Sequence, residues 1–259
     1  MTLLRIGKEL GAALNRLRFG PPVARVYNPL VYAWQPFARY HELYGGGTRE
    51  VLLLGMNPGP WGMAQTGIPF GEVNIARDWL GVAAPVGRPP REHPRRPILG
   101  FNCPRSEVSG VRLWSWARDT FGTPRRFFKR FFVSNYCPLC FMETSGRNLT
   151  PDRLPAASRE RLLAACDRAL RKTVDFLRPR FVVGVGGFAE RRARAVLAGT
   201  DVVVGRILHP SPASPAANKD WAAQAADQLI TLGITLPKIE INRRSVPRRA
   251  RGRFGDRRP

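Results

Sequence analysis

The sequence predicts a three-layer α/β/α fold, in which helices cover both faces of a central, mainly parallel four-stranded sheet. Three observations predict this class. Four short apolar segments have the length of buried strands, amphipathic helical patterns alternate with them, and no repeat of fixed period is present. A chain of 259 residues with 44% hydrophobic composition is also large enough to build one substantial core.

The elements are expected in the following order. The first 19 residues have the pattern of an amphipathic helix, and the charges from Arg5 to Arg18 are too closely spaced for the apolar core of a secretory signal. Buried strands are expected at residues 50–55, 131–135, 180–184 and 202–208. Helices are expected at residues 74–80, 112–121, 154–177 and 188–197, and a last one at 215–232.

The charge balance predicts a polyanionic partner. The chain carries 42 Lys and Arg against 19 Asp and Glu, a formal net charge of +23, so nucleic acid is the first candidate. Residues 1–240 are expected to form a single domain, and residues 241–259 a basic, disordered tail that binds phosphate without sequence preference. The basic, Pro-rich stretch 85–105 is too long for a connector and indicates a functional loop. A solvated basic surface is the alternative for both segments.

Cysteine usage and hydropathy limit the class further. Four cysteines without a regular pattern favour a reducing compartment and buried thiols, because they are too few to cross-link a chain of this length. Cys137 and Cys140 form one close pair, and a four-cysteine zinc or iron–sulfur site lacks its second pair, so we expect no metal. Apolar runs far shorter than about 20 residues predict no membrane span.

Polar or glycine-rich segments follow each predicted strand. The first strand leads into Asn57, the second ends at Asn135, the third leads into the glycines at 184–187, and the fourth leads into His209. The carboxyl ends of parallel strands meet at one edge of a sheet, which is where open α/β folds bind ligands. Two amides and an imidazole are therefore expected to converge at that edge.

The same edge offers few groups for other chemistries. The run from Gly184 to Ala189 matches the dinucleotide fingerprint only formally, because no acid follows the next strand to hold a ribose, and a tight turn is expected instead. The sequence lacks the Gly-x-Ser-x-Gly motif that carries the nucleophile of many serine hydrolases, so this class is not expected. Glu72 is expected to be the only carboxylate nearby. The amides and the imidazole suit hydrogen bonding to a heterocycle and stabilisation of charge on a leaving group.

Three segments carry a resemblance to a known family. Residues 55–73, GMNPGPWGMAQTGIPFGEV, closely resemble the first motif of the single-strand-selective monofunctional uracil-DNA glycosylases, and residues 209–219, HPSPASPAANK, resemble their second. Residues 135–139, NYCPL, are similar to the family's base-recognition segment, and residues 106–110 also fit. The resemblance spans about residues 25–235 in matching order and implies a uracil-DNA glycosylase-like fold.

The resemblance implies a hydrolase that flips uracil, or a 5-substituted relative such as 5-hydroxymethyluracil, out of DNA and cleaves its N-glycosidic bond to leave an abasic site. It implies that Asn57 positions the attacking water and that His209 stabilises the departing uracil anion at O2. By the same resemblance, Asn135 binds the N3 and O4 edge and Phe70 stacks on the ring. The substrate site is completed by Met56, Gly59 and Met63.

Two positions distinguish this sequence within the resemblance. The residue after His-Pro-Ser-Pro is usually an arginine that wedges into the duplex, and here it is Ala213, so a preference for single strands and for weakly paired or mismatched uracil is expected. Gly59 stands where the main uracil-specific family carries a bulky aromatic that excludes thymine, which favours a broader pyrimidine range. Contacts to DNA are expected from Ser211, Ala213, Lys219, Arg95 and Arg96.

The expected partner is therefore single- or double-stranded DNA that contains uracil or modified uracil, bound by a monomer without a cofactor. A nuclear location is expected in a eukaryotic host and a cytoplasmic, nucleoid-associated one in a bacterium. Two alternatives stay open. One is a non-catalytic nucleic-acid binding module, and the other is an iron–sulfur relative in the same superfamily.

Overall fold

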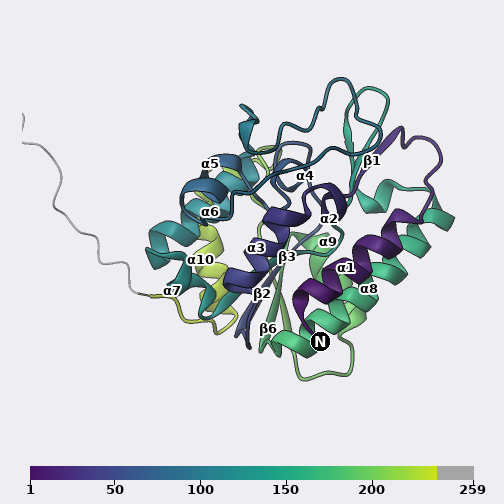
Figure 1. The fold of residues 1–259 in the computed structure, drawn as a ribbon. Helices are drawn as coiled ribbons and strands as arrows, with labels where there is room; N and C mark the ends of the chain where they lie inside the picture. Colours follow the sequence, from purple (N-terminus) through teal and green to yellow (C-terminus); the bar gives the residue numbers. More distant parts are fainter. Residues whose placement is uncertain (238–259) are drawn as a thin grey trace, which may run out of the picture.

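A parallel four-stranded sheet forms the centre of the molecule, as predicted (Figure 1). Its strands lie in the order β3-β2-β6-β7, and Val51 pairs with both Phe131 and Phe181, so neighbouring strands begin level with one another. Their carboxyl ends therefore meet at one edge, at the top of Figure 1. The strands are β2 (Val51–Gly55), β3 (Phe131–Asn135), β6 (Phe181–Val185) and β7 (Val203–Ile207).

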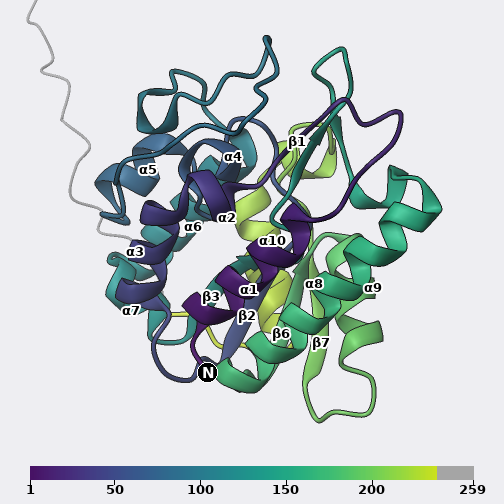
Figure 2. The same ribbon diagram turned by 45° about the vertical axis from the view of Figure 1, so that its right-hand side comes forward.

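Helices cover both faces of this sheet and complete the three predicted layers. Helices α1 (Leu3–Asn15), α8 (Ala156–Leu177) and α9 (Gly187–Val196) lie on one face (Figures 1 and 2). Helices α6 (Val108–Phe121), α7 (Pro124–Phe128) and α10 (Trp221–Thr231) lie on the other. Successive strand residues serve the two faces, since Phe131 packs on Trp116 of α6 whereas Phe132 contacts Tyr40 of α3 (Trp34–Tyr44) beside the β3 edge.

The hydrophobic pattern of the sequence did not predict a second, smaller sheet. It has three antiparallel strands in the order β1-β4-β5, namely β1 (Arg25–Tyr27), β4 (Cys140–Met142) and β5 (Asn148–Leu149). Strands of two or three residues are too short to show a period-two alternation. Strand β4 follows β3 after four residues, so β4 and β5 lie beside the carboxyl edge of the central sheet.

The last predicted helix, residues 215–232, is wrong as one continuous element. It is split into the 3₁₀ turn η3 (Ala216–Asn218) and α10, because Asp220 starts a new helix by accepting a hydrogen bond from the N–H of Ala223 at 3.1 Å. The prediction at 112–121 is right in position, but α6 begins four residues earlier, at Val108. Short elements complete the chain, namely α2 (Pro29–Tyr32), α4 (Met63–Thr66), α5 (Val73–Asp78), η1 (Gly100–Asn102) and η2 (Pro151–Arg153).

The computed structural model describes residues 1–237, so the basic tail expected at 241–259 lies outside the described residues. All four cysteines are free and buried, as predicted, and burial raises the pKa of Cys140 to about 12. Within residues 1–237, no three His, Cys, Asp or Glu side chains gather as metal ligands. A search of the same residues finds no helix long and apolar enough to span a membrane.

Candidate active site

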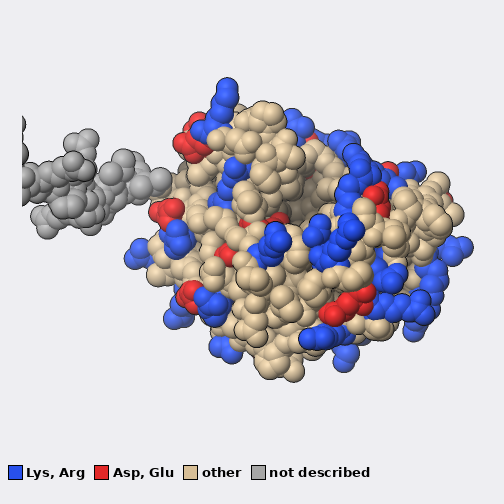
Figure 3. Space-filling view, turned by 90° about the horizontal axis from the view of Figure 1, so that it is seen from above, with Lys and Arg blue, Asp and Glu red and all other residues tan. Residues whose placement is uncertain are grey.

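A cavity of about 350 Å³ opens at the carboxyl edge of the central sheet, and we call it the edge cavity. Its walls come from the loops after β2 and β7, the end of β3, the segment around β5 and the start of α6. Figure 3 looks down on this face, where the surface is hollowed. The structure thus brings together eight of the expected site residues, Met56, Asn57, Gly59, Met63, Phe70, Asn135, His209 and Ser211.

The side-chain amide of Asn57 is held in one orientation by backbone carbonyls. Its Nδ2 donates to the carbonyls of Leu139 at 3.2 Å, Pro58 at 3.3 Å and Leu149 at 3.4 Å. These acceptors require the nitrogen on their side, so Oδ1 points away from them, and it is buried without a partner among the described residues. A buried acceptor without a partner is costly unless a ligand or water supplies a donor. Asn57 therefore keeps one acceptor free at the edge cavity.

His209 presents a hydrogen-bond donor to the same cavity. The backbone N–H of Ser211 donates to Nδ1 of His209 at 3.1 Å, so the proton of the neutral ring is on Nε2. Burial lowers the pKa of His209 below its ordinary value. The imidazole is therefore neutral at pH 7, and its Nε2–H is fixed as the donor.

Phe70 and Asn135 pack together against Gly55. A Cβ at Gly55 would lie 2.2 Å from Oδ1 of Asn135 and 2.6 Å from the Phe70 ring, so only glycine leaves room for both. Phe70 has a φ of 53°, a left-handed conformation that is strained for an aromatic residue. Nδ2 of Asn135 lies 3.3 Å from Sδ of Met63. The strained turn thus sets a flat ring beside an amide with one donor and one acceptor side, the groups that bind a planar heterocycle.

Sequence reasoning missed Glu107, a carboxylate that lines the edge cavity. Its Oε2 is buried without a partner among residues 1–237, and it sits against Gly62 and Gly110, where a Cβ would lie 2.4 and 2.8 Å away. Burial raises the pKa of Glu107 to about 7, and the charge of Glu72 adds to this rise, while the N–H of Gly110 opposes it. Glu107 could have been found from the sequence, because it lies within residues 106–110, which resemble the family.

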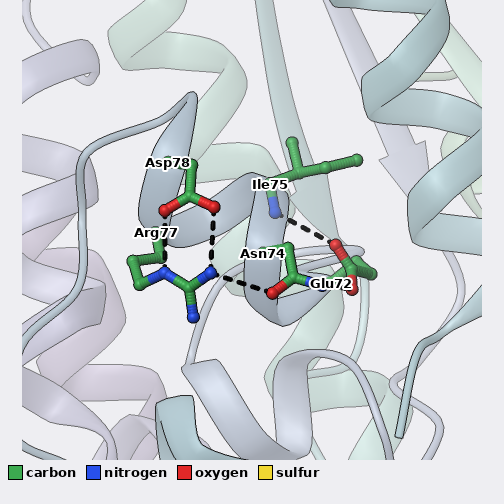
Figure 4. A network of polar contacts seen from close by, with 5 residues as sticks. All are labelled: Glu72, Asn74, Ile75, Arg77 and Asp78. Carbon is green, nitrogen blue, oxygen red and sulfur yellow. Dashed lines mark hydrogen bonds and ion pairs between the residues drawn. The ribbon is translucent and has the colours of Figure 1, made fainter. Parts of the chain in front are cut away.

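Glu72 has a structural role instead, so the expectation that it is the one carboxylate near this edge is wrong. Its Oε2 accepts from the N–H of Ile75 at 3.0 Å and caps α5, and its Oε1 accepts from Asn74 at 3.4 Å. Arg77 extends the network to Asn74 and Asp78 (Figure 4). Both oxygens of the Glu72 carboxylate thus accept hydrogen bonds from the first turn of α5.

The glycine run after β6 serves packing. A Cβ at Gly184 would lie 2.3 Å from the backbone N of Glu190, so glycine lets α9 approach the sheet closely. Gly186 has a φ of 95°, and a Cβ there would lie 3.2 Å from Cβ of His209. The segment is therefore the tight turn that was expected, and it leaves room for His209.

The loop after β7 carries three of the residues expected to contact DNA. Ser211 lines the edge cavity, whereas Ala213 and Lys219 are exposed outside it. Arg112 of α6 holds the loop, because its Nη1 donates to the carbonyl of Pro210 at 3.1 Å. The position after His-Pro-Ser-Pro is thus an exposed residue on an anchored loop.

The remaining two expected DNA contacts, Arg95 and Arg96, lie on the 85–105 stretch and do not line the edge cavity. Arg95 is exposed, and the guanidinium of Arg96 lies 5.0 Å from the ring centroid of Trp61. Buried Gln65 ties this stretch to the loop after β2. Its Nε2 donates to the carbonyls of Pro60 at 2.9 Å and Pro97 at 3.0 Å.

Known proteins match most of the chain. The family model of the uracil DNA glycosylase superfamily matches residues 44–230. The chain is 56% identical over 228 residues to the single-strand selective monofunctional uracil DNA glycosylase of Mus musculus, which covers 87% of this chain and 82% of that protein. Its counterpart in Bos taurus is 54% identical over 87% of this chain and 84% of its own length.

A solved structure supports the fold independently. The crystal structure of wild-type Pedobacter heparinus SMUG2 superposes with a TM-score of 0.65 and covers 90% of this chain and 97% of that one. At 19% identity this likeness shows the fold alone. The family match and the close relatives show more: the chain belongs to the single-strand-selective monofunctional uracil-DNA glycosylase family, within the uracil-DNA glycosylase superfamily.

Proposed function

We propose that this protein excises uracil from DNA by taking up a flipped-out base and hydrolysing its N-glycosidic bond, which leaves an abasic site. One observation carries the proposal: a free amide acceptor, Oδ1 of Asn57, and a fixed imidazole donor, Nε2–H of His209, share the edge cavity. The monofunctional uracil-DNA glycosylases that are 54% and 56% identical to the chain support it.

His209 acts on the leaving base. As the bond between C1′ and N1 breaks, the base takes the electron pair and departs as an anion whose charge spreads onto its carbonyl oxygens. The Nε2–H of neutral His209 donates to O2, and this hydrogen bond strengthens as the charge develops. Asn135 accepts from N3–H and donates to O4, while Phe70 stacks on the ring.

Asn57 acts on the water. Its free Oδ1 accepts a hydrogen bond from a water molecule and so directs the water oxygen toward C1′. An amide does not take up a proton near neutral pH, so the water attacks after the glycosidic bond has largely broken. The water oxygen then bonds to C1′. After that bond has formed, its extra proton passes to bulk water, from which the released base anion takes up a proton.

The proposed substrate range includes uracils with a substituent on C5, such as 5-hydroxymethyluracil. A Cβ at Gly59 would meet no atom within 4 Å, so the cavity wall is open at this position. A bulky side chain at the same place would close the wall to a substituent. The open wall at Gly59 supports this broader range.

The oligomeric state of the enzyme, the strandedness of its DNA and its location in the cell are also part of the proposed function. We propose that the enzyme acts as a monomer. We propose that both single- and double-stranded DNA are substrates, and that the enzyme works where the DNA is, in the nucleus of a eukaryote or at the nucleoid of a bacterium.

The test uses Asn57→Ala, with Asn102→Ala as a matched control at an exposed position. Each protein is incubated with an end-labelled single strand that contains one uracil, and alkali then cleaves the abasic sites. Asn57→Ala should lower excision by more than about 10²-fold and leave DNA binding nearly unchanged, because placement of the water matters at the chemical step. Thermal unfolding of both variants separates this effect from loss of the three hydrogen bonds.

Other results would contradict the proposed function. Excision by Asn57→Ala at the wild-type rate would refute the assigned mechanism. Binding without any excision by the wild type would identify a non-catalytic nucleic-acid binding module.

A further inference from the structure

A second hollow, of about 1080 Å³, lies beside the edge cavity, and we call it the arginine groove. It runs between the end of α1, the segment from β1 to the start of α3, and residues 85–91 of the basic loop. It is about three times as large as the edge cavity and has no part in the chemistry described above.

The groove is strongly positive. Arg18, Arg25, Arg88 and Arg91 line it, and among the described residues no Asp or Glu does. Arg18, Arg88 and Arg91 are exposed, and the pair between Arg88 and Glu92 is long, at 3.9 Å between Nη1 and Oε2. These guanidinium groups suit a chain of phosphates.

Aromatic side chains lie between the arginines. Phe19, Tyr32 and Trp34 line the groove, and all three are partly exposed. Each ring packs against another aromatic ring of the protein. The ring centroids are 5.0 Å apart for Phe19 and Phe141, 6.2 Å for Tyr32 and Tyr27, and 5.4 Å for Trp34 and Phe37. Unpaired bases stack on such rings, whereas the bases of a duplex stack on one another and leave no face free. The combination favours a single strand over a duplex.

The groove shares a thin wall with the edge cavity. Leu139 lines the groove, and its carbonyl accepts from Nδ2 of Asn57 at 3.2 Å. The hydroxyl of Tyr32 donates to the carbonyl of Ala64, which follows Met63 of the edge cavity. The groove and the edge cavity are therefore neighbours, separated by Asn57 and Leu139.

From this arrangement we propose that the arginine groove binds the unpaired DNA strand on one side of the flipped nucleotide, with its phosphates on the arginines and its bases on the aromatic rings. The inference rests on the proposed function, since it takes the edge cavity as the site of the flipped base. It accounts for a preference for single strands by attraction outside the cavity and not by the chemistry inside it.

The first experiment measures excision from single strands that are lengthened one nucleotide at a time on the 5′ or the 3′ side of a single uracil. The wild type should show a KM that falls with length on one side only. The variant Arg18→Gln/Arg88→Gln/Arg91→Gln should lose this dependence, with a KM for the long strand raised about tenfold, an unchanged kcat, and a salt slope lower by about two.

The matched control is Arg118→Gln/Arg125→Gln/Arg126→Gln, which removes the same charge from exposed positions on α6 and α7, away from the groove (Figure 1). It should keep the length dependence of the wild type. An equal loss in both triple variants would overturn the proposal, because net charge alone would then explain it. A loss on the shortest substrate as well would also overturn it.

The second experiment changes the DNA and leaves the protein intact. Abasic spacers replace the bases beside the uracil but keep the phosphates, and they should raise the KM of the wild type because they remove stacking. Equal KM values with and without the flanking bases would overturn the claim that bases stack on the aromatic rings of the groove. Displacement of the strand by polyglutamate as readily as by an oligonucleotide would show a general anion site and overturn the assignment to nucleic acid. Failure to excise uracil from strands of every length would instead contradict the proposed function itself.

Discussion

The tautomer of His209 depends on a single backbone N–H. Ser211 occupies Nδ1 at 3.1 Å, which leaves Nε2–H as the donor, and burial lowers the pKa of the ring. Because the pKa in the fold is below that of the unfolded chain, the fold is destabilised as the pH falls below the ordinary value of about 6.5. His41 acts with the same sign, since burial lowers its pKa to about 4. Acidification should therefore weaken the fold.

Loss of His209 should affect the chemical step. His209→Ala removes the proposed hydrogen-bond donor to the leaving base, and such a donor typically contributes about 10²- to 10³-fold in rate. Single-turnover excision of uracil from a single strand should fall by that factor, while affinity for an oligonucleotide with an abasic site stays nearly constant. A variant with the wild-type single-turnover rate would contradict the assigned role.

Glu107 should give excision an alkaline limit. The pKa of Glu107 is raised to about 7, so ionisation above this pH places a negative charge in the cavity from which an anion departs. The wild-type rate should fall as the pH rises through about 7, and Glu107→Gln should be flat over the same range. If the rate of excision falls equally at alkaline pH in both proteins, the ionisation of another group is responsible.

The same residue should alter stability in the opposite direction to His209. The pKa of Glu107 in the fold lies above its ordinary value of 4.5, so between these values the fold holds a proton that the unfolded chain has lost. The contribution of Glu107 to the free energy of unfolding, which is the difference between the wild type and Glu107→Gln, should therefore fall as the pH rises from about 4.5 to 7. Urea unfolding of Glu107→Gln over this range serves as the control, because the amide does not titrate.

Among the elements, the smaller sheet helps to orient Asn57 in the site. The carbonyls of Leu139, just before β4, and Leu149, in β5, hold the amide of Asn57. Two strands of two or three residues thus decide which end of that amide faces the edge cavity. Their sequence has no alternation to reveal them, because their pairing is set by contact with each other and with β1.

The loop after β7 should control the use of duplex DNA. Opening a base pair costs a few kcal/mol, and an inserted side chain normally helps to hold the gap open. Ala213 is exposed on this loop, which Arg112 anchors, so Ala213→Arg should raise excision from duplex DNA and change the rate on single strands little. The ratio of kcat/KM for the two substrates measures this effect.

An arginine of the 85–105 stretch is the rival source of such a wedge. In that case the wild type should excise paired and unpaired uracil at equal rates, and Ala213→Arg should leave the ratio unchanged. Ala213→Ser, which adds a small polar group without reach, is the matched control for the substitution itself.

At the scale of the whole molecule, the net charge of +23 sets the attraction to DNA. Residues 243–259 contribute eight arginines and one aspartate, and they lie outside the described residues. Their deletion should lower the affinity for any DNA and reduce the dependence of that affinity on salt, since fewer counterions are released. Titration at several salt concentrations measures both, and an unchanged salt slope would contradict the expectation.

The sequence by itself determined the central sheet, its two helical layers and the edge at which Asn57, Asn135 and His209 meet. Buried strands and amphipathic helices are encoded by local hydrophobic patterns, and a parallel topology then brings every strand end to one edge. The long first motif determined the family in the same way, because its residues are contiguous.

Only the tertiary structure decided which atoms face the edge cavity. The free Oδ1 of Asn57 depends on carbonyls of Leu139 and Leu149, which lie far along the chain, and the raised pKa of Glu107 depends on its burial against Gly62 and Gly110. The arginine groove likewise joins the end of α1 to residues 85–91. Hydrogen bonding, burial and charge at these places arise between segments that are distant in sequence, so no local pattern records them.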